Sequence, residues 1–86
     1  MPLKYTARFE HRYERLPLGI RYKVDKALKL LEANFLHPGL RSHPVESAPG
    51  IFEAYIDRKY RMTYERAGDT LILRNVDNHN DCLKNP

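Results

Sequence analysis

The chain has no tryptophan, only one cysteine and no long apolar run. The single cysteine, Cys82, excludes an internal disulfide and a cysteine-based zinc site, and it is typical of a reducing compartment. No motif activates it as a nucleophile, so we expect a packed side chain. The four histidines lack metal-ligand spacing, so no metal or other cofactor is expected. Without a membrane span of about 20 apolar residues or a signal peptide, the sequence predicts a cytoplasmic protein that has no contact with membranes.

The length of 86 residues predicts one domain. With 42% apolar and 30% charged residues, the composition is typical of a globular chain. The formal charge of +4 favours an anionic partner, nucleic acid first. Residues 1–34 hold 8 Lys/Arg against 4 Asp/Glu, whereas residues 35–86 hold 7 of each. A solvated helix surface is the alternative explanation of the N-terminal excess.

Three segments in the second half of the chain predict β-strands, at residues 51–57, 60–65 and 70–76. The connections between them, at residues 58–59 and 66–69, are short enough to join only neighbouring antiparallel strands. We therefore expect a β-meander. The third segment is apolar on both faces, which indicates a central position in the sheet.

Alternation sorts the side chains of the first two segments onto two faces of the sheet. The apolar face consists of Phe52, Ala54, Ile56, Tyr60, Met62 and Tyr64. The polar face consists of Glu53, Tyr55, Asp57, Arg61, Thr63 and Glu65, and His79 follows the last strand. We expect the apolar face to be buried and function to lie on the polar face or at its rim.

The first half of the chain predicts a strand and a long helix. Alternation over residues 4–10 favours an opening strand, and residues 11–16 allow one or two helical turns. Apolar residues at i, i+4, i+7, i+8 and i+11 from Ile20 predict an amphipathic helix over residues 18–34. Pro17 suits its first position and Asn34 its C-terminal cap. Residues 35–50 predict a loop with a short strand near 40–45, and residues 77–86 a short polar tail.

Together these elements predict an α+β fold. In it, the N-terminal strand and two helices pack on one face of the antiparallel β-meander. The apolar stripe of the long helix needs a partner surface, and the apolar face of the meander is the only large one available.

The order and spacing of these segments resemble those of a known family. The motifs are LP at residues 16–17, KV and KAL within residues 23–28, HPGL at 37–40, GIFEAYID at 50–57, YRMTYE at 60–65 and GDTLILRNVDNHND at 68–81. As an ordered set over about residues 9–83, they resemble the RelE/ParE superfamily of toxins from type II toxin–antitoxin pairs. The set is more specific for the fold than for the activity.

The resemblance implies a small toxin that a cognate antitoxin protein neutralises. Members of the RelE branch are mRNA endonucleases (mRNA interferases) that usually act in the ribosomal A site. They cut by metal-independent transesterification, in which the ribose 2′-OH attacks the adjacent phosphate. Members of the ParE branch share the fold, poison DNA gyrase and lack the nuclease residues. We expect the nuclease branch, and the alternative is a gyrase inhibitor or a non-catalytic antitoxin-binding module.

The resemblance also assigns site residues by position. Arg61 matches an arginine that many nuclease members carry on the second meander strand. His79 falls where several members place a catalytic histidine or arginine after the last strand. In contrast, Glu53 and Tyr55 fall where the best-known branch has lysines, and Leu83 falls where some members have an aromatic residue. These departures favour the non-catalytic alternative.

Attack by a 2′-OH needs a base, positive charge on the phosphate and an acid for the leaving 5′-oxygen. Arg61 can supply the charge, because its guanidinium stays protonated and binds phosphate oxygens bidentately. His79 can act as base or acid, with His43 in the opposite role. Tyr55 can stack on a base or hold the phosphate. Further candidate RNA contacts are the cations Arg41, Arg58, Lys59 and Arg74.

Each assignment has a structural alternative. Arg61 can form a cross-strand ion pair with Glu53 or Glu65. His79 can be an ordinary residue of a polar tail. His43 precedes a proline and can be a turn residue.

Overall fold

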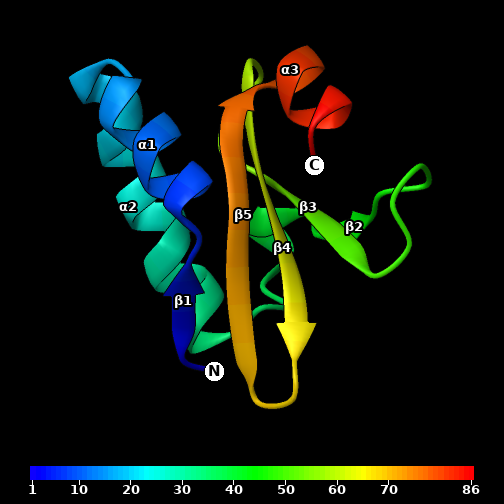
Figure 1. Ribbon diagram of the computed structural model, residues 1–86. Coiled ribbons are helices and arrows are strands. Elements are labelled where there is room, and N and C mark those ends of the chain that lie inside the picture. Colours follow the sequence, from blue (N-terminus) through cyan, green and yellow to red (C-terminus); the bar gives the residue numbers. More distant parts are fainter.

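A computed structural model describes all residues of the chain, Met1–Pro86. Its centre is a five-stranded sheet in the order β1-β5-β4-β3-β2 (Figure 1). The strands are β1 (Leu3–Tyr5), β2 (His43–Pro44), β3 (Ile51–Tyr55), β4 (Tyr60–Ala67) and β5 (Thr70–Asn78). β1 runs parallel to β5, and the other pairs are antiparallel. The predicted meander is β3-β4-β5, and its third strand lies inside the sheet, between β1 and β4.

The β4–β5 hairpin explains the unusual apolar pattern of β5, which is the third strand of the predicted meander. Its turn contains Gly68 with φ of 64°, a left-handed conformation that favours glycine. Thr63 pairs with Asn75 whereas Tyr64 pairs with Leu73, so the strand carries a β-bulge. The extra residue moves Asn75 to the face opposite the core, although it is two residues after Leu73.

The prediction of a strand over residues 4–10 is wrong beyond Tyr5. Strand β1 ends at Tyr5, and helix α1 (Ala7–Arg15) begins at Ala7. The Thr6 side chain caps this helix by accepting a hydrogen bond from the Phe9 backbone N–H at 3.1 Å. Phe9 and Tyr13, four residues apart, then face the core together. The alternation that indicated a strand is equally compatible with one turn of helix when a cap precedes it.

Helix α2 (Leu18–Ala33) follows the prediction closely. Pro17 occupies the N-cap position, one residue before the predicted one, and Asn34 is the C-cap, with its N–H donating to the Leu30 carbonyl at 2.8 Å. A short 3-10 helix, η1 (Pro38–Leu40), lies in the region predicted as loop, and β2 falls within the short strand expected near residues 40–45. None of the helices combines the length and apolar character that crossing a membrane requires.

Helices α1 and α2 lie on one side of the sheet, as predicted (Figure 1). Their apolar side chains and those of the strands form one core. It consists of Phe9, Leu16, Val24, Ala27, Leu31, Leu40, Ala54, Met62, Tyr64, Leu71, Leu73 and Val76. The predicted α+β architecture is confirmed, including the burial of the apolar face of the meander.

The segment predicted as a short polar tail, residues 77–86, contains the end of β5 and helix α3 (His79–Lys84), which the sequence did not predict. The Asn78 side chain caps it by accepting a hydrogen bond from the Asp81 N–H at 3.0 Å. α3 lies on the side of β4 and β5 away from α1 (Figure 1). There it covers a row of buried polar side chains in register across three strands, Glu53, Thr63 and Asn75.

The tail satisfies two members of this row. Thr63 Oγ1 donates to the Pro86 carbonyl at 2.8 Å, and Asn75 Nδ2 donates to the Asn85 carbonyl at 2.8 Å. Because buried polar groups need partners, these bonds hold the end of the chain on the polar face. Glu53, the third member, has different partners.

Candidate functional site

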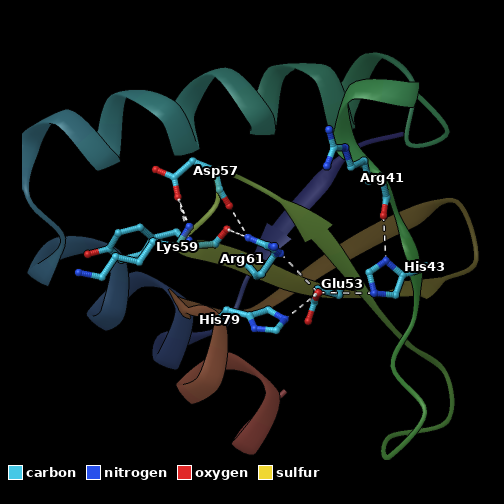
Figure 2. A network of polar contacts seen from close by, with 8 residues as sticks. Arg41, His43, Glu53, Asp57, Lys59, Arg61 and His79 are labelled. Atoms are coloured by element: carbon cyan, nitrogen blue, oxygen red, sulfur yellow. Dashed lines mark hydrogen bonds and ion pairs between the residues drawn. The ribbon is translucent and has the colours of Figure 1, made fainter.

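The carboxylate of Glu53 is the centre of a cluster built from four elements, β2, β3, β4 and α3 (Figure 2). Its Oε1 lies 3.5 Å from Nε2 of His43, 3.6 Å from Nε of Arg61 and 4.0 Å from Nε2 of His79. The Glu53 side chain is only 3% exposed, and its second oxygen, Oε2, has no hydrogen-bond partner. One oxygen is therefore surrounded by cationic or potentially cationic groups, and the other is a buried acceptor without a partner.

The backbone explains why these side chains meet. His43 is directly opposite Glu53 in the β2–β3 ladder, and Arg61 reaches across from β4. His79 is the first residue of α3, and its N–H donates to the Lys59 carbonyl at 2.7 Å. That bond ties the start of α3 to the β3–β4 turn and holds the His79 ring at the edge of the sheet. The structure thus brings together three of the predicted catalytic residues.

Arg61 is held mainly by the protein itself. Its Nη1 donates to the carbonyl oxygens of Asp57 and Tyr60, and its Nε faces Glu53. The side chain is 17% exposed, and Nη2 neither makes a hydrogen bond within the chain nor is buried without a partner. The predicted alternative, an ion pair with Glu53 across the strands, is therefore present. Nη2 is left as a donor toward solvent.

The two histidines differ in how they are fixed. Nδ1 of His43 lies 2.9 Å from the Arg41 carbonyl, which can only accept, so Nδ1 carries a proton. Its Nε2 can bond to the Glu53 carboxylate only if it is also protonated. The ring of His79 has no hydrogen bond within the chain and contacts Glu53 only at 4.0 Å. Both rings are accessible, with side chains 59% and 45% exposed respectively.

Tyr55 lies beside the cluster between two arginines. The guanidinium carbon of Arg41 is 4.6 Å from the centre of the Tyr55 ring, and that of Arg61 is 4.7 Å from it. These distances are within the range of cation–π contacts. Tyr55 thus helps to position the arginine that faces Glu53.

The other predicted RNA contacts divide into two groups. Arg58 and Lys59 are exposed on the β3–β4 turn, next to the start of α3. Arg74 lies outside the cluster, where its Nη1 pairs with Glu65 at 3.0 Å and its Nε donates to the Pro86 carbonyl at 3.2 Å. Its charge is therefore compensated within the protein.

Asp57 fixes the β3–β4 turn that supports the cluster. Its carboxylate accepts hydrogen bonds from Nζ of Lys23 at 3.0 Å and from the N–H groups of Lys59 and Tyr60 at 2.8 Å each. Burial alone would raise the pKa of Asp57, but these hydrogen bonds outweigh burial and lower the pKa below its usual value. The backbone carbonyl of Asp57 accepts a hydrogen bond from Arg61, so the turn also helps to hold Arg61 in place.

Cys82, a residue of α3, is buried, as predicted. Burial, together with the negative charges of Glu53 and Asp77, raises the pKa of the thiol to about 12. The thiol therefore stays protonated at neutral pH and takes no part in the chemistry of the cluster.

Sequence reasoning missed the role of Glu53. The sequence places the residue on the polar face and predicts its ion pair with Arg61, since a carboxylate and an arginine on neighbouring strands of one face are expected to pair. It does not predict that His43 and His79 contact the same carboxylate. These contacts depend on β2 and α3, which a pattern of strands does not locate.

No protein-family model matches the chain, and no curated protein matches it. Solved structures do. A YoeB/ParE toxin from Agrobacterium tumefaciens is 18% identical with a TM-score of 0.77, over 92% of this chain and 99% of that one. The toxin–antitoxin complexes RelB–RelE from Methanococcus jannaschii and DinJ–YafQ from E. coli contain chains 19% and 17% identical, with TM-scores of 0.74 and 0.73. The match to the RelB–RelE complex covers 91% of this chain and 92% of that one. The match to the DinJ–YafQ complex covers 92% of each chain. These likenesses show that the chain has the RelE/ParE-like fold, as its motifs predicted.

Proposed function

We propose that the chain is the toxin of a type II toxin–antitoxin system and that it cleaves mRNA on the ribosome without a metal ion. The observation that carries this proposal is the convergence of Arg61, His43 and His79 on the buried carboxylate of Glu53. The fold shared with YoeB, RelE and YafQ supports it. A base, an acid and a fixed cation are the groups that transesterification by a 2′-OH requires.

In this mechanism Glu53 is the general base. Its Oε2 is an unpaired acceptor, whereas Oε1 is held by its neighbours. Oε2 is buried without a partner in the free protein, so the carboxylate turns toward the substrate to accept the proton of the 2′-OH while O2′ forms a bond to phosphorus. This differs from the assignment of the base to a histidine, which the residue types alone suggested.

His79 and Arg61 complete the reaction. Nη2 of Arg61 binds a phosphate oxygen and stabilises the charge that develops in the transition state. His79, whose ring is free of hydrogen bonds within the chain, donates a proton to O5′ as the P–O5′ bond breaks. The products are a 2′,3′-cyclic phosphate and a 5′-OH end. His43 keeps Oε1 of Glu53 occupied and so leaves Oε2 to the substrate.

The proposal includes two kinds of partner. One is mRNA bound to the ribosome, for which the exposed cations Arg41, Arg58 and Lys59 provide positive charge around the cluster. The other is a cognate antitoxin protein, as the solved complexes of RelE with RelB and of YafQ with DinJ suggest. Both partners place the protein in the cytoplasm.

Cleavage of mRNA on programmed ribosomes tests the proposal. The wild type should produce fragments with 5′-OH ends, and Glu53→Gln and His79→Ala should each reduce the rate by at least about 100-fold. Arg15→Ala, an exposed change on α1, is the control and should leave the rate unchanged. If the wild type does not cleave, the nuclease class is wrong. If His79→Ala cleaves at the normal rate, His79 is not the acid.

A second candidate function is a non-catalytic protein of the same fold, either a gyrase inhibitor or an antitoxin-binding module. It is favoured by Arg61, whose Nη1 and Nε are already occupied by protein groups. Growth arrest that survives Glu53→Gln combined with His79→Ala, together with inhibition of gyrase supercoiling, would establish it in place of the nuclease.

A further inference from the structure

The ring of Tyr55 is flanked by arginines from both of its neighbouring strands. Arg61 is its direct cross-strand partner on β4. On the other side, His43 pairs with Glu53, and Arg41 precedes His43 by two residues, which places Arg41 next to Tyr55. The two guanidinium groups, 4.6 and 4.7 Å from the ring centre, therefore reach it from opposite sides of β3.

Arg41 differs from Arg61 because no polar group of the chain binds its side chain. Its guanidinium makes no hydrogen bond and no ion pair, and the residue is exposed. Five N–H donors and one planar surface are thus presented to solvent beside the cluster. An exposed arginine without a polar partner is usually mobile, but contact with Tyr55 holds this one at the site.

The backbone of Arg41 also supports a role at the site. It is the only non-glycine residue with positive φ, at 48°, a left-handed conformation that is unfavourable for an L-residue. In this conformation its carbonyl accepts the hydrogen bond from Nδ1 of His43 at 2.9 Å. Arg41 is therefore linked to the Glu53 cluster twice, through His43 by its backbone and through Tyr55 by its side chain.

A nuclease that acts on single-stranded RNA needs a planar group to hold a base, and aromatic rings or guanidinium planes serve this purpose. α3 provides none, since its residues after His79 include no aromatic side chain and the exposed apolar one is Leu83. We infer that the guanidinium of Arg41, supported by the Tyr55 ring, stacks on a base of the bound mRNA next to the scissile phosphate. This inference rests on the proposed nuclease function and names the residue that positions the substrate.

The test measures binding rather than cleavage. Labelled protein is titrated with programmed ribosomes whose A-site codon carries 2′-O-methyl groups, so that the 2′-OH cannot attack. Arg41→Ala and Arg41→Lys are compared with the wild type, because lysine keeps the charge but has no plane to stack. The same titrations are repeated with each base of the codon removed in turn. Arg15→Ala and Arg15→Lys on α1 are the matched controls, and circular dichroism checks the folding of all variants.

Stacking predicts a specific pattern. Arg41→Ala and Arg41→Lys should both bind the intact codon about tenfold more weakly than the wild type. Removal of one particular base should weaken the wild type by a similar factor and leave both Arg41 variants unchanged. The Arg15 controls should match the wild type throughout.

Other outcomes overturn the inference in distinguishable ways. If Arg41→Lys binds like the wild type, or if Arg41→Ala keeps its deficit whichever base is removed, Arg41 contacts phosphate through its charge. In either case, normal cleavage by the wild type leaves the proposed function intact. If the wild type neither binds nor cleaves, the proposed function fails and the inference fails with it.

Discussion

Glu53 imposes a requirement on its neighbours that explains much of the site. A carboxylate with a 3% exposed side chain has lost most of its hydration and needs a compensating charge. Among its three neighbours, only Arg61 is a cation at every relevant pH. The first role of Arg61 is therefore to stabilise Glu53, and the proposed binding of phosphate through Nη2 would be added to that role.

This dependence predicts non-additive effects on stability. Arg61→Ala should lower the free energy of unfolding by about 3 kcal/mol, because it leaves a buried carboxylate without its permanent counterion. Glu53→Gln combined with Arg61→Ala should cost clearly less than the sum of the two single changes. Urea unfolding of the four proteins measures the coupling, and Lys26→Ala on the exposed side of α2 is the neutral control. Additive losses would show that the ion pair does not stabilise the fold.

The thiol of Cys82 reports on the packing of α3. Because it is buried and its pKa is about 12, a thiol-specific reagent at about pH 8 should label it far more slowly than free cysteine, whose pKa is about 8.5. The labelling rate should rise to that of free cysteine in urea. Fast labelling of the native protein would mean that α3 opens readily from the polar face.

At the level of single residues, the sequence predicted the members of the site better than their roles. Residue types and the family resemblance identified Arg61, His79, His43 and Tyr55. The role of Glu53 depends on burial beneath α3, and burial follows from long-range packing that no local pattern records. The same limit applies to Arg41, whose conformation is set by the loop around it.

Among the elements, the β3–β4 turn connects the Glu53 cluster to helix α2, which lies on the other face of the sheet. The Asp57 carboxylate binds Nζ of Lys23, which comes from α2, and two N–H groups of the turn. Its own carbonyl binds Arg61, and the Lys59 carbonyl binds the start of α3. This one turn therefore connects helices α2 and α3 with Arg61.

The stability contributed by Asp57 should depend on pH with a known sign. Its pKa is lowered in the folded protein, so its contribution is present above the unfolded pKa of about 3.9 and is lost as the pH falls through the folded value. We expect the unfolding free energy of the wild type to drop at acidic pH more steeply than that of Asp57→Asn. At neutral pH, Asp57→Asn should cost about 1 kcal/mol. Urea unfolding between about pH 3 and pH 7 measures both, and parallel curves would contradict the assignment.

The elements that the sequence predicted are those with a repeating pattern. The strands β3 and β4 alternate, β5 is apolar on both faces, and α2, a helix of 16 residues, carries an apolar stripe. In contrast, α1 and α3 are short, and each is specified by one capping side chain, Thr6 and Asn78, and by packing on the sheet. Helices this short are not stable alone, so their sequences need only fit a surface that other elements provide.

In the whole molecule, the two faces of the sheet have separate tasks. One face is covered by α1 and α2 and contains the core, and the other holds the cluster beside α3 (Figure 1). The excess of Lys/Arg in residues 1–34 therefore lies mostly on the layer away from Glu53. Positive charge near the cluster comes instead from the loop before β2 and from the β3–β4 turn. Net charge alone would therefore have directed attention to the layer away from the cluster.

This division also predicts how much the site depends on the distant core. A domain of this size has an unfolding free energy of only about 5–10 kcal/mol. Leu73 is fully buried on β5, in the core under the helices, so Leu73→Ala should cost about 3 kcal/mol. Leu18, whose exposed fraction is 73%, is the matched control, and Leu18→Ala should change stability by less than about 0.5 kcal/mol. Because Leu73 faces the core and not the cluster, Leu73→Ala should lower cleavage on programmed ribosomes only in proportion to the unfolded fraction. A larger loss in a protein that is still folded by circular dichroism would show that core packing sets the geometry around Glu53.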